Sequence, residues 1–188
     1  MRIISGKFCG KRLKSLAGDI TRPTTDKVKE SLFNIIGPYF DGGACLDLFA
    51  GSGALGIEAV SRGMSYAVLV ERNFKAMQVI KSNVELIGAK DCFKLIKKNA
   101  TAALSALVSL NLRFDLIFLD PPYKQQEIES QLEKLQNLHL LTKNVLIVAK
   151  TASKVRLPQR VRKLTQYRKQ VYGITAIYFF GFEEINNE

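Results

Sequence analysis

The sequence has few of the residues that bind metals or form disulfides. Its three cysteines, Cys9, Cys45 and Cys92, lie far apart, and His139 is the only histidine. A structural zinc site needs four ligands, usually supplied as closely spaced pairs, and no Cys-x-x-Cys pair occurs. We therefore expect no metal site, and we expect the three thiols to be reduced and mostly buried.

Long apolar runs are also missing. No stretch approaches the roughly 18 consecutive apolar residues that a transmembrane helix requires. The segment 1–7 carries positive charge but no apolar run of the kind found in secretory signals. We therefore expect a cytoplasmic protein without a membrane partner. The length of 188 residues and the hydrophobic content of 47% suit one domain with a sizeable core.

The net charge of +11 is distributed unevenly along the chain. Residues 1–30 contain eight Lys/Arg and three Asp/Glu, and residues 150–170 contain eight Lys/Arg and no acid. The intervening residues 31–149 are nearly balanced, with twelve basic and eleven acidic residues. A solvated charged face is one interpretation of such segments. The lopsided segment 150–170 favours nucleic acid, because cations that neutralise phosphates gain free energy from counterion release.

Apolar runs alternate with amphipathic segments along the chain. Strands are predicted at residues 44–49, 66–71, 93–96, 114–119, 145–149 and 174–180. Helices are predicted from Thr24 or Thr25 to Gly37-Pro38, and at residues 54–62, 73–87, 101–110 and 125–136. This alternation predicts βαβ units and a parallel sheet covered on both faces. Gly173 predicts a C-terminal hairpin, and residues 1–14 are expected to form a short glycine-containing arm outside the core.

Gly51-Ser52-Gly53-Ala54-Leu55-Gly56 forms a G-x-G-x-x-G loop between a predicted strand and a predicted helix. Such glycines permit a tight turn and close approach of a ligand, and the helix N-terminus presents free N–H groups. Glu71 follows about twenty residues later, where a carboxylate can bind ribose hydroxyls. The loop therefore predicts an adenosine cofactor. It does not separate NAD from S-adenosylmethionine, although Asp47 is placed to pair with a methionine ammonium group.

Asp120-Pro121-Pro122-Tyr123 follows the predicted strand 114–119, at the edge of a parallel sheet where ligands bind. An exocyclic amine of a nucleobase is a poor nucleophile, because its lone pair is conjugated with the ring. The Asp120 carboxylate and a rigidly held prolyl carbonyl can accept its two hydrogens, and Tyr123 can stack on the base. Because a methyl sulfonium is already electrophilic, positioning is the main requirement. The tetrapeptide therefore predicts methylation of an amino group by S-adenosylmethionine.

These two motifs resemble the first and fourth motifs of class I methyltransferases. The terminal segments resemble more narrowly the RsmD family, bacterial enzymes that methylate the N2 amine of one guanine in 16S ribosomal RNA. The segments that carry this resemblance are Arg2–Gly6, Gly10–Leu13, Arg22–Asn34 and Tyr172-Gly173 with the last strand. The resemblance implies a Rossmann-like class I methyltransferase fold. That fold has a seven-stranded, mostly parallel sheet, an antiparallel C-terminal hairpin and a short N-terminal β arm.

The resemblance also implies residue roles. The residues expected to contact the cofactor are Asp47, Phe49, Ala50, Gly51, Ser52, Gly53, Glu71, Arg72, Asn99 and Ala100. Asn99 and Ala100 would flank the adenine, and Asn99 also suits a helix N-cap. Asp120 to Tyr123 would hold the guanine, with Arg22 and Thr24 at the border of the site. One departure concerns the position just after the fifth strand, where family members tend to carry an acid and this chain has Ala149-Lys150-Thr151.

The basic segments are expected to bind the phosphates of the substrate. We predict a single methyltransferase domain over residues 1–188, with a basic arm at 1–20 and a catalytic core at 21–188. Lys11 and Arg12 in the arm, and Arg160 and Arg162 in the basic segment 150–170, would contact 16S rRNA within the 30S subunit while the guanine is flipped out. We expect a monomer.

Two alternatives remain at this stage. An adenine-N6 DNA methyltransferase uses the same kind of tetrapeptide, although the chain offers no extra target-recognition domain. A non-catalytic RNA-binding protein is the other alternative, and the intact Asp120 and Gly53 argue against it.

Overall fold

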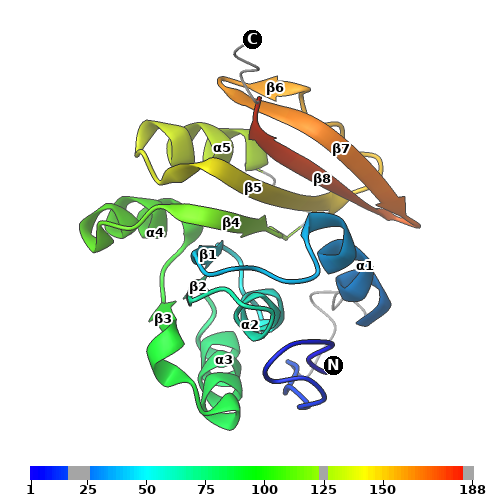
Figure 1. Cartoon of the computed structure of the whole chain (residues 1–188). Helices are drawn as coiled ribbons and strands as arrows, with labels where there is room; N and C mark the ends of the chain where they lie inside the picture. Colours follow the sequence, from blue (N-terminus) through cyan, green and yellow to red (C-terminus); the bar gives the residue numbers. More distant parts are fainter. Residues whose placement is uncertain (17–25, 123–126, 184–188) are drawn as a thin grey trace.

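The computed structural model describes residues 1–16, 26–122 and 127–183, and these residues form an α/β fold around one mixed sheet (Figure 1). The strands are β1 Ala44–Asp47, β2 Tyr66–Val70, β3 Phe93–Ile96, β4 Phe114–Leu119, β5 Leu141–Ala152, β6 Arg160–Val161, β7 Leu164–Tyr172 and β8 Thr175–Phe182. The helices are α1 Asp26–Ile36, α2 Ala54–Ser61, α3 Phe74–Ile87, α4 Ala100–Leu107 and α5 Ile128–Asn137, with short 3₁₀ turns at Lys90–Cys92 and Val108–Leu110.

The strand order is β3-β2-β1-β4-β5-β8-β7-β6. The first five strands pair in parallel and the last three in antiparallel. The predicted parallel sheet with an antiparallel C-terminal hairpin is therefore confirmed. The predicted count of seven strands is wrong, because the described residues contain eight. The additional strand, β6, has two residues that pair with the beginning of β7, which is too short to produce a recognisable apolar pattern.

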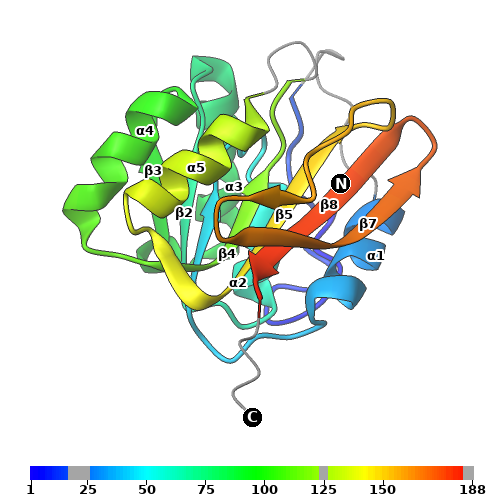
Figure 2. The same cartoon turned by 90° about the horizontal axis from the view of Figure 1, so that it is seen from above.

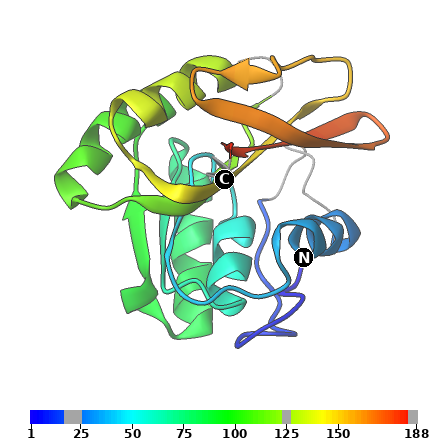
Figure 3. The same cartoon turned by 45° about the horizontal axis from the view of Figure 1, so that its top comes forward.

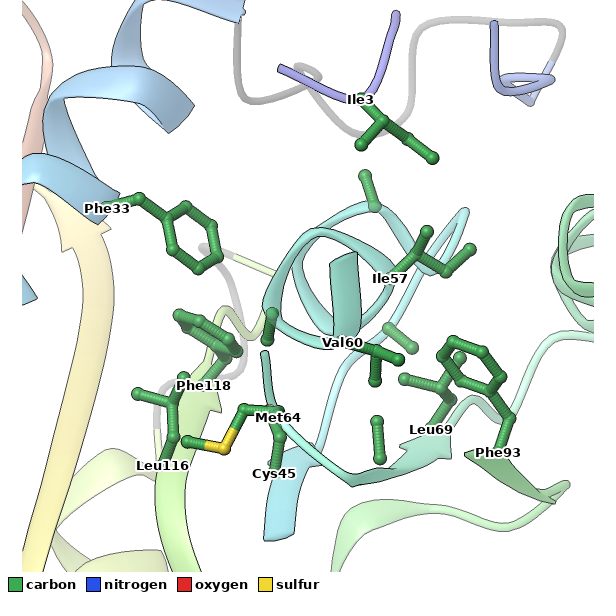
Figure 4. Close-up of a cluster of buried hydrophobic side chains, with 14 of the residues drawn as sticks. Ile3, Phe33, Cys45, Ile57, Val60, Met64, Leu69, Phe93, Leu116 and Phe118 are labelled. Carbon is green, nitrogen blue, oxygen red and sulfur yellow. The ribbon is translucent and has the colours of Figure 1, made fainter. Parts of the chain in front are cut away.

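Helices cover both faces of the sheet. Helices α1, α2 and α3 lie on one face and α4 and α5 on the other, and Figures 1 and 2 show these two layers. Figure 4 shows the hydrophobic core between the sheet and helices α1, α2 and α3. In this core Phe33 of α1 contacts Phe118 of β4, with their ring centroids 5.9 Å apart. Strands buried on both faces explain why the central runs are continuously apolar instead of alternating. Within the described residues, no helix combines the length and apolarity that a membrane span requires.

The N-terminal arm is part of the core. Arg2 and Arg12 form an antiparallel bridge, as expected for a short β arm. Ile3, Phe8 and Leu13 are nevertheless buried, so the prediction that this segment lies outside the core is wrong. Their alternation with glycines and cations hid an apolar side that packs on α2 and α1, and Figure 3 shows the arm beside these helices.

Two contacts fasten the arm to the end of α2. The Lys7 N–H donates to the Ser61 carbonyl at 2.7 Å, and the Ser61 hydroxyl donates to the Ser5 carbonyl at 2.6 Å. Gly6 has a φ of +85°, and a Cβ at this position would lie 1.8 Å from the Ser61 carbonyl oxygen. Only glycine fits there, because any side chain would collide with backbone.

A buried ionic cluster joins the arm, α1 and α2. Glu58 pairs with Lys29 at 3.0 Å and with Arg62 at 2.8 Å, and all three side chains are almost fully buried. The same carboxylate accepts the N–H groups of Ile4 and Ser5. Every charge in the cluster therefore has partners, which is the condition under which a buried ion pair is tolerated.

Several predicted boundaries are confirmed. Helix α3 begins after Asn73, whose side chain accepts the Ala76 N–H, and ends at Gly88 with a φ of +73°. The hairpin of β7 and β8 turns at Gly173, as predicted, and the Tyr172 hydroxyl bonds the Ser31 hydroxyl of α1 at 2.6 Å. The predicted N-caps Thr24 and Thr25 lie outside the described residues.

The cysteines follow their prediction only in part. All three are free, but Cys45 alone is buried, whereas Cys92 is half-buried and Cys9 is exposed. Cys9 lies in the turn of the arm between Phe8 and Gly10, where its thiol donates to the Ile4 carbonyl.

Candidate functional site

The two motifs meet at the carboxyl ends of the parallel strands. β1 and β4 are neighbours in the sheet, so Asp47 at the end of β1 and Asp120 after β4 reach the same edge. The Leu48 N–H donates to the Phe118 carbonyl at 3.1 Å and extends this contact beyond β1. The topology therefore brings together residues that are more than seventy positions apart, at the place where open α/β sheets bind ligands.

The glycine loop is held in shape from three sides. The Gly51 N–H donates to the Glu71 carboxylate at 3.0 Å, and the Asn83 amide donates to the Ser52 carbonyl at 2.9 Å. Ala50 is tied to β2 through its N–H, which donates to the Val70 carbonyl. Gly51 and Gly53 have φ values of +56° and +82°, and apart from its chain neighbours no described atom lies within 4 Å of a Cβ built at Gly51. At Gly51 the loop therefore presents bare backbone to open space, as a ligand cradle requires.

Asp47 is a buried carboxylate with an incomplete set of partners. Its side chain is 1% exposed, and Oδ2 accepts the Gly56 N–H at 3.3 Å. Among the described residues, Oδ1 has no hydrogen-bond partner. Burial raises the pKa of Asp47 to about 7, with a further increase from the nearby Asp120 and a smaller one from Glu71, against the N–H groups of Gly56 and Phe49. A buried acceptor without a partner is costly, so this site suits a cationic donor.

Glu71 and Asn99 stand at the ends of β2 and β3. Both Glu71 oxygens already accept backbone N–H groups, from Gly51 and from Asn73, and a carboxylate retains further lone pairs for hydroxyl donors. Asn99 is the N-cap of α4 and accepts the Ala102 N–H at 2.8 Å, so the cap role is confirmed. Ala100 follows it as the first residue of α4, and Arg72 is exposed beside Glu71.

These residues fit S-adenosylmethionine. The unpartnered oxygen of Asp47 suits the ammonium group in the methionine part of the cofactor. The bare loop at Gly51 leaves room for the rest of that methionine part. Phe49 is half-buried and Ala50 is buried, so these two residues give the site an apolar side. A pyrophosphate would place negative charge near Asp47, Glu71 and Asp120, which argues for a cation-bearing cofactor over NAD.

Asp120 is held by a lysine from the next strand. Lys150 Nζ of β5 lies 2.8 Å from Asp120 Oδ2, and the two side chains are 12% and 24% exposed. Burial raises the pKa of Asp120, whereas the charge and hydrogen bond of Lys150 lower it. Pro121 is buried and Pro122 is exposed, and Tyr123 lies outside the described residues.

The predicted phosphate-binding cations are not gathered at this edge. Lys11 donates to the Leu86 and Ile87 carbonyls at the end of α3, at 3.3 and 3.4 Å, and therefore caps that helix. Arg12 is exposed in the arm. Arg160 pairs with Glu183 at 2.5 Å and Arg162 bonds Asn137.

Arg160 begins β6 and Arg162 directly follows it, towards the amino-terminal edge of the parallel strands. In the register of the sheet, Arg160 lies opposite Thr165 of β7, and Thr165 lies opposite Gly181 of β8. Phe180, next to Gly181, pairs with Ile147, three residues before Lys150 in β5. The strand order separates β6 from β4 by four strand spacings, or about 20 Å. Arg22 and Thr24 lie outside the described residues.

Two residues that shape the site were not predicted from the sequence. Asn83 interrupts the apolar side of α3 and is buried, where it bonds Ser52 and both backbone groups of Lys14. A polar residue within an apolar helical stripe was the available signal. Lys150 was noted only as a departure, although a charge directly after an apolar strand indicates a partner at the sheet edge.

No group of three or more His, Cys, Asp or Glu residues in the described part of the chain is arranged to hold a metal ion. Asp120 instead pairs with the cation Lys150.

Known proteins resemble this chain along most of its length. The family model described as "Conserved hypothetical protein 95" matches residues 1–181. "Putative rRNA methyltransferase YlbH" of Bacillus subtilis is 47% identical over 180 residues, which cover 96% of this chain and 98% of that protein. "Ribosomal RNA small subunit methyltransferase D" of Escherichia coli is 32% identical over 97% of this chain and 90% of its own length.

A solved structure agrees with these relatives. The structure of "Putative methyltransferase yhhF" from Escherichia coli is 32% identical, has a TM-score of 0.83, and covers 97% of this chain and 98% of that one. The family match over residues 1–181 and the identities over nearly whole chains show that this chain belongs to the family of ribosomal RNA small subunit methyltransferase D, the RsmD family.

Proposed function

We propose that this protein transfers a methyl group from S-adenosylmethionine to the exocyclic N2 amine of one guanine in 16S ribosomal RNA. The observation that carries the proposal is the meeting of Asp47, the glycine loop and Asp120-Pro121-Pro122 at one edge of the sheet in a chain of the RsmD family. The choice of RNA and guanine comes from the relatives that are named as rRNA methyltransferases and from the family resemblance. A DNA adenine methyltransferase is the rival that the experiment below tests.

The cofactor would lie along the ends of β1, β2 and β3. Asp47 Oδ1 would accept a hydrogen bond from the ammonium group of the cofactor, and the backbone of Gly51, Ser52 and Gly53 would lie along its methionine part. Glu71 would bind the ribose hydroxyls with its remaining lone pairs. Phe49, Ala50 and Arg72 would line the path, and Asn99 and Ala100 would flank the adenine. When bound, the cofactor supplies an electrophilic methyl group.

The guanine amine would be activated by two fixed hydrogen-bond acceptors, one for each of its hydrogens. Lys150 holds Asp120 Oδ2, which leaves Oδ1 to accept one amine hydrogen. A carbonyl of Pro121-Pro122 would accept the other, so that the nitrogen lone pair points at the methyl donor. Burial raises the pKa of Asp120, and the positive charge of Lys150 opposes this increase and so favours the ionised form that accepts hydrogen bonds. Tyr123 would stack on the base, and Arg22 and Thr24 would border it.

The same proposal extends to the rest of the chain. Residues 1–188 would act as one methyltransferase domain, a cytoplasmic monomer that binds 16S rRNA in the 30S subunit. Lys11, Arg12, Arg160 and Arg162 would contribute contacts to phosphates away from the catalytic edge.

Methyl transfer from labelled cofactor to undermethylated 30S subunits, naked rRNA and DNA tests the proposal, with mass analysis of the nucleosides. We expect N2-methylguanine in rRNA. An Asp120→Ala variant should bind S-adenosylhomocysteine normally and lose about a hundredfold or more in transfer rate, since one oriented acceptor is removed. Asp91→Ala, an exposed change in the Lys90–Cys92 turn, is the matched control. Product found only as N6-methyladenine in DNA would overturn the proposal.

A further inference from the structure

Four cations and one aromatic ring gather at the carboxyl ends of β2 and β3. This surface, the β2–β3 edge patch, consists of Arg72, Phe74, Lys75, Lys97 and Lys98, all of them exposed. Lys97 Nζ lies 4.9 Å from the centroid of the Phe74 ring, and 60% of Phe74 is exposed. The two segments are tied together by the Glu71 N–H, which donates to the Ile96 carbonyl at 3.1 Å. The patch therefore combines residues that lie more than twenty positions apart in the sequence.

The acid next to the patch in the sequence is engaged with the backbone. Glu71 accepts the Gly51 N–H with one carboxylate oxygen and the Asn73 N–H with the other. Asp91 precedes β3 and lies at the opposite end of that strand. Lys75, Lys97 and Lys98 are exposed cations of this patch. This concentration was hidden in the sequence, because residues 31–149 are nearly neutral as a whole.

The location of the patch distinguishes it from the other cations of the chain. β2 and β3 are two and three strands from β4, so the patch lies about 10–15 Å from the carboxyl end that carries Asp120. Figure 1 shows β3 and β6 at the two opposite ends of the sheet. Lys11 and Arg160, by contrast, are engaged with Leu86 and Glu183 away from the catalytic edge.

We propose that the β2–β3 edge patch binds the single-stranded RNA next to the target guanine. A neighbouring base stacks on the exposed face of Phe74, and Lys97 and Lys98 bind the adjoining phosphates. An exposed aromatic ring surrounded by cations is the chemistry by which proteins bind unpaired nucleotides. The proposal rests on the proposed function, since a base delivered to Asp120 brings its flanking strand across this edge.

Three variants test the patch. The first, Lys97→Ala with Lys98→Ala, removes two charges, and the second, Phe74→Ala, removes the ring. The matched control, Lys81→Ala with Lys143→Ala, removes two exposed charges elsewhere. Binding of a short single-stranded RNA of mixed sequence is measured over a range of KCl concentrations. Binding of S-adenosylhomocysteine is measured in parallel to report an intact cofactor site.

The double lysine variant should weaken RNA binding and reduce the slope of log affinity against log salt by about 1.4, at roughly 0.7 per phosphate contact. Phe74→Ala should weaken binding about fivefold or more and leave the slope unchanged, because stacking releases no ions. All three variants should bind S-adenosylhomocysteine as the wild type does. Unchanged RNA affinity and slope in the patch variants, or losses equal to those of the control, would overturn the inference.

The two proposals fail separately. Wild-type protein that produces no N2-methylguanine in undermethylated 30S subunits contradicts the proposed function. Wild-type protein that methylates guanine while the patch variants bind and methylate RNA normally contradicts only the inference. Preferential binding of polyglutamate over RNA at the patch, lost in the lysine variant, would assign the surface to an acidic protein partner and also overturn it.

Discussion

Glu58 and Asp47 are both buried carboxylates, and their surroundings differ in one respect. Glu58 on α2 has two cations and two backbone N–H groups as partners. Asp47 at the end of β1 is equally buried, but only Oδ2 has a partner among the described residues. Glu58 is therefore complete within the protein, whereas Asp47 is incomplete, and we propose that a ligand completes it. Under this proposal, Glu58 stabilises the fold and Asp47 serves a binding site.

The largest expected effect concerns the complete carboxylate. Glu58→Ala leaves Lys29 and Arg62 buried without their counter-ion, so we expect the free energy of unfolding to fall by about 3–5 kcal/mol. Urea denaturation followed by circular dichroism measures it. Glu85→Ala breaks the exposed pair with Lys90 and should change stability by less than about 1 kcal/mol. Equal effects of the two substitutions would show that the buried cluster is not a stabilising element.

The incomplete carboxylate should respond in the opposite way. Asp47→Asn removes a buried, underpaired charge, so unfolding stability at pH 8 should stay the same or increase. Affinity for S-adenosylhomocysteine should fall by about 1.5–3 kcal/mol, the usual value of a hydrogen bond to a charged group. Calorimetric titration and thermal unfolding provide the two measurements. A large loss of stability with unchanged affinity would assign Asp47 to the fold and not to the cofactor.

The raised pKa of Asp47 makes cofactor binding depend on pH. The ammonium group requires the ionised carboxylate, so affinity for S-adenosylhomocysteine should rise from pH 5.5 to about 7, by up to ~1.4 kcal/mol per pH unit. Below pH 7, binding should release a proton. In the protein without cofactor, stability changes with pH in the opposite direction to affinity. Above about pH 4 the folded state holds a proton on Asp47 that the carboxyl group has lost in the unfolded state. Stability without cofactor therefore decreases as pH rises from about 4 to 7.

Titration in buffers of different ionisation enthalpy measures the released proton. The Asp47→Asn variant is the control, and it should lose both the proton release and the dependence of affinity on pH in this range. A proton release that persists in this variant would place the titrating group elsewhere.

The smallest expected effect concerns Lys150. Lys150→Met removes the charge that lowers the pKa of Asp120, so the acid limb of the pH–rate profile should move to higher pH. The rate at pH 8.5 should fall by a smaller factor, about tenfold or less. Lys150→Arg should restore the wild-type profile in part. A uniform loss of rate at all pH values would indicate that Lys150 serves only the packing of β5.

Local pattern predicted the elements that have their own periodicity. Residues 93–96 and 114–119 are strands as predicted, because continuous apolar runs bounded by turns identify buried strands. β6 was missed, since Arg160–Val161 is a strand only through its pairing with β7. The arm was placed outside the core because its three buried side chains, Ile3, Phe8 and Leu13, are five residues apart, a spacing that matches neither the helical nor the strand period.

The sequence by itself determined that Asp47, the glycine loop, Glu71 and Asp120 each lie at or just after the end of a strand, because hydrophobic periodicity and turn residues are local properties. Only the tertiary structure decided which charges meet. Lys150 reaches Asp120 from thirty positions away because β5 pairs with β4, and Lys97 reaches Phe74 because β3 pairs with β2. Strand order depends on the packing of the whole chain, so the net charge of a segment does not predict which side chains become neighbours.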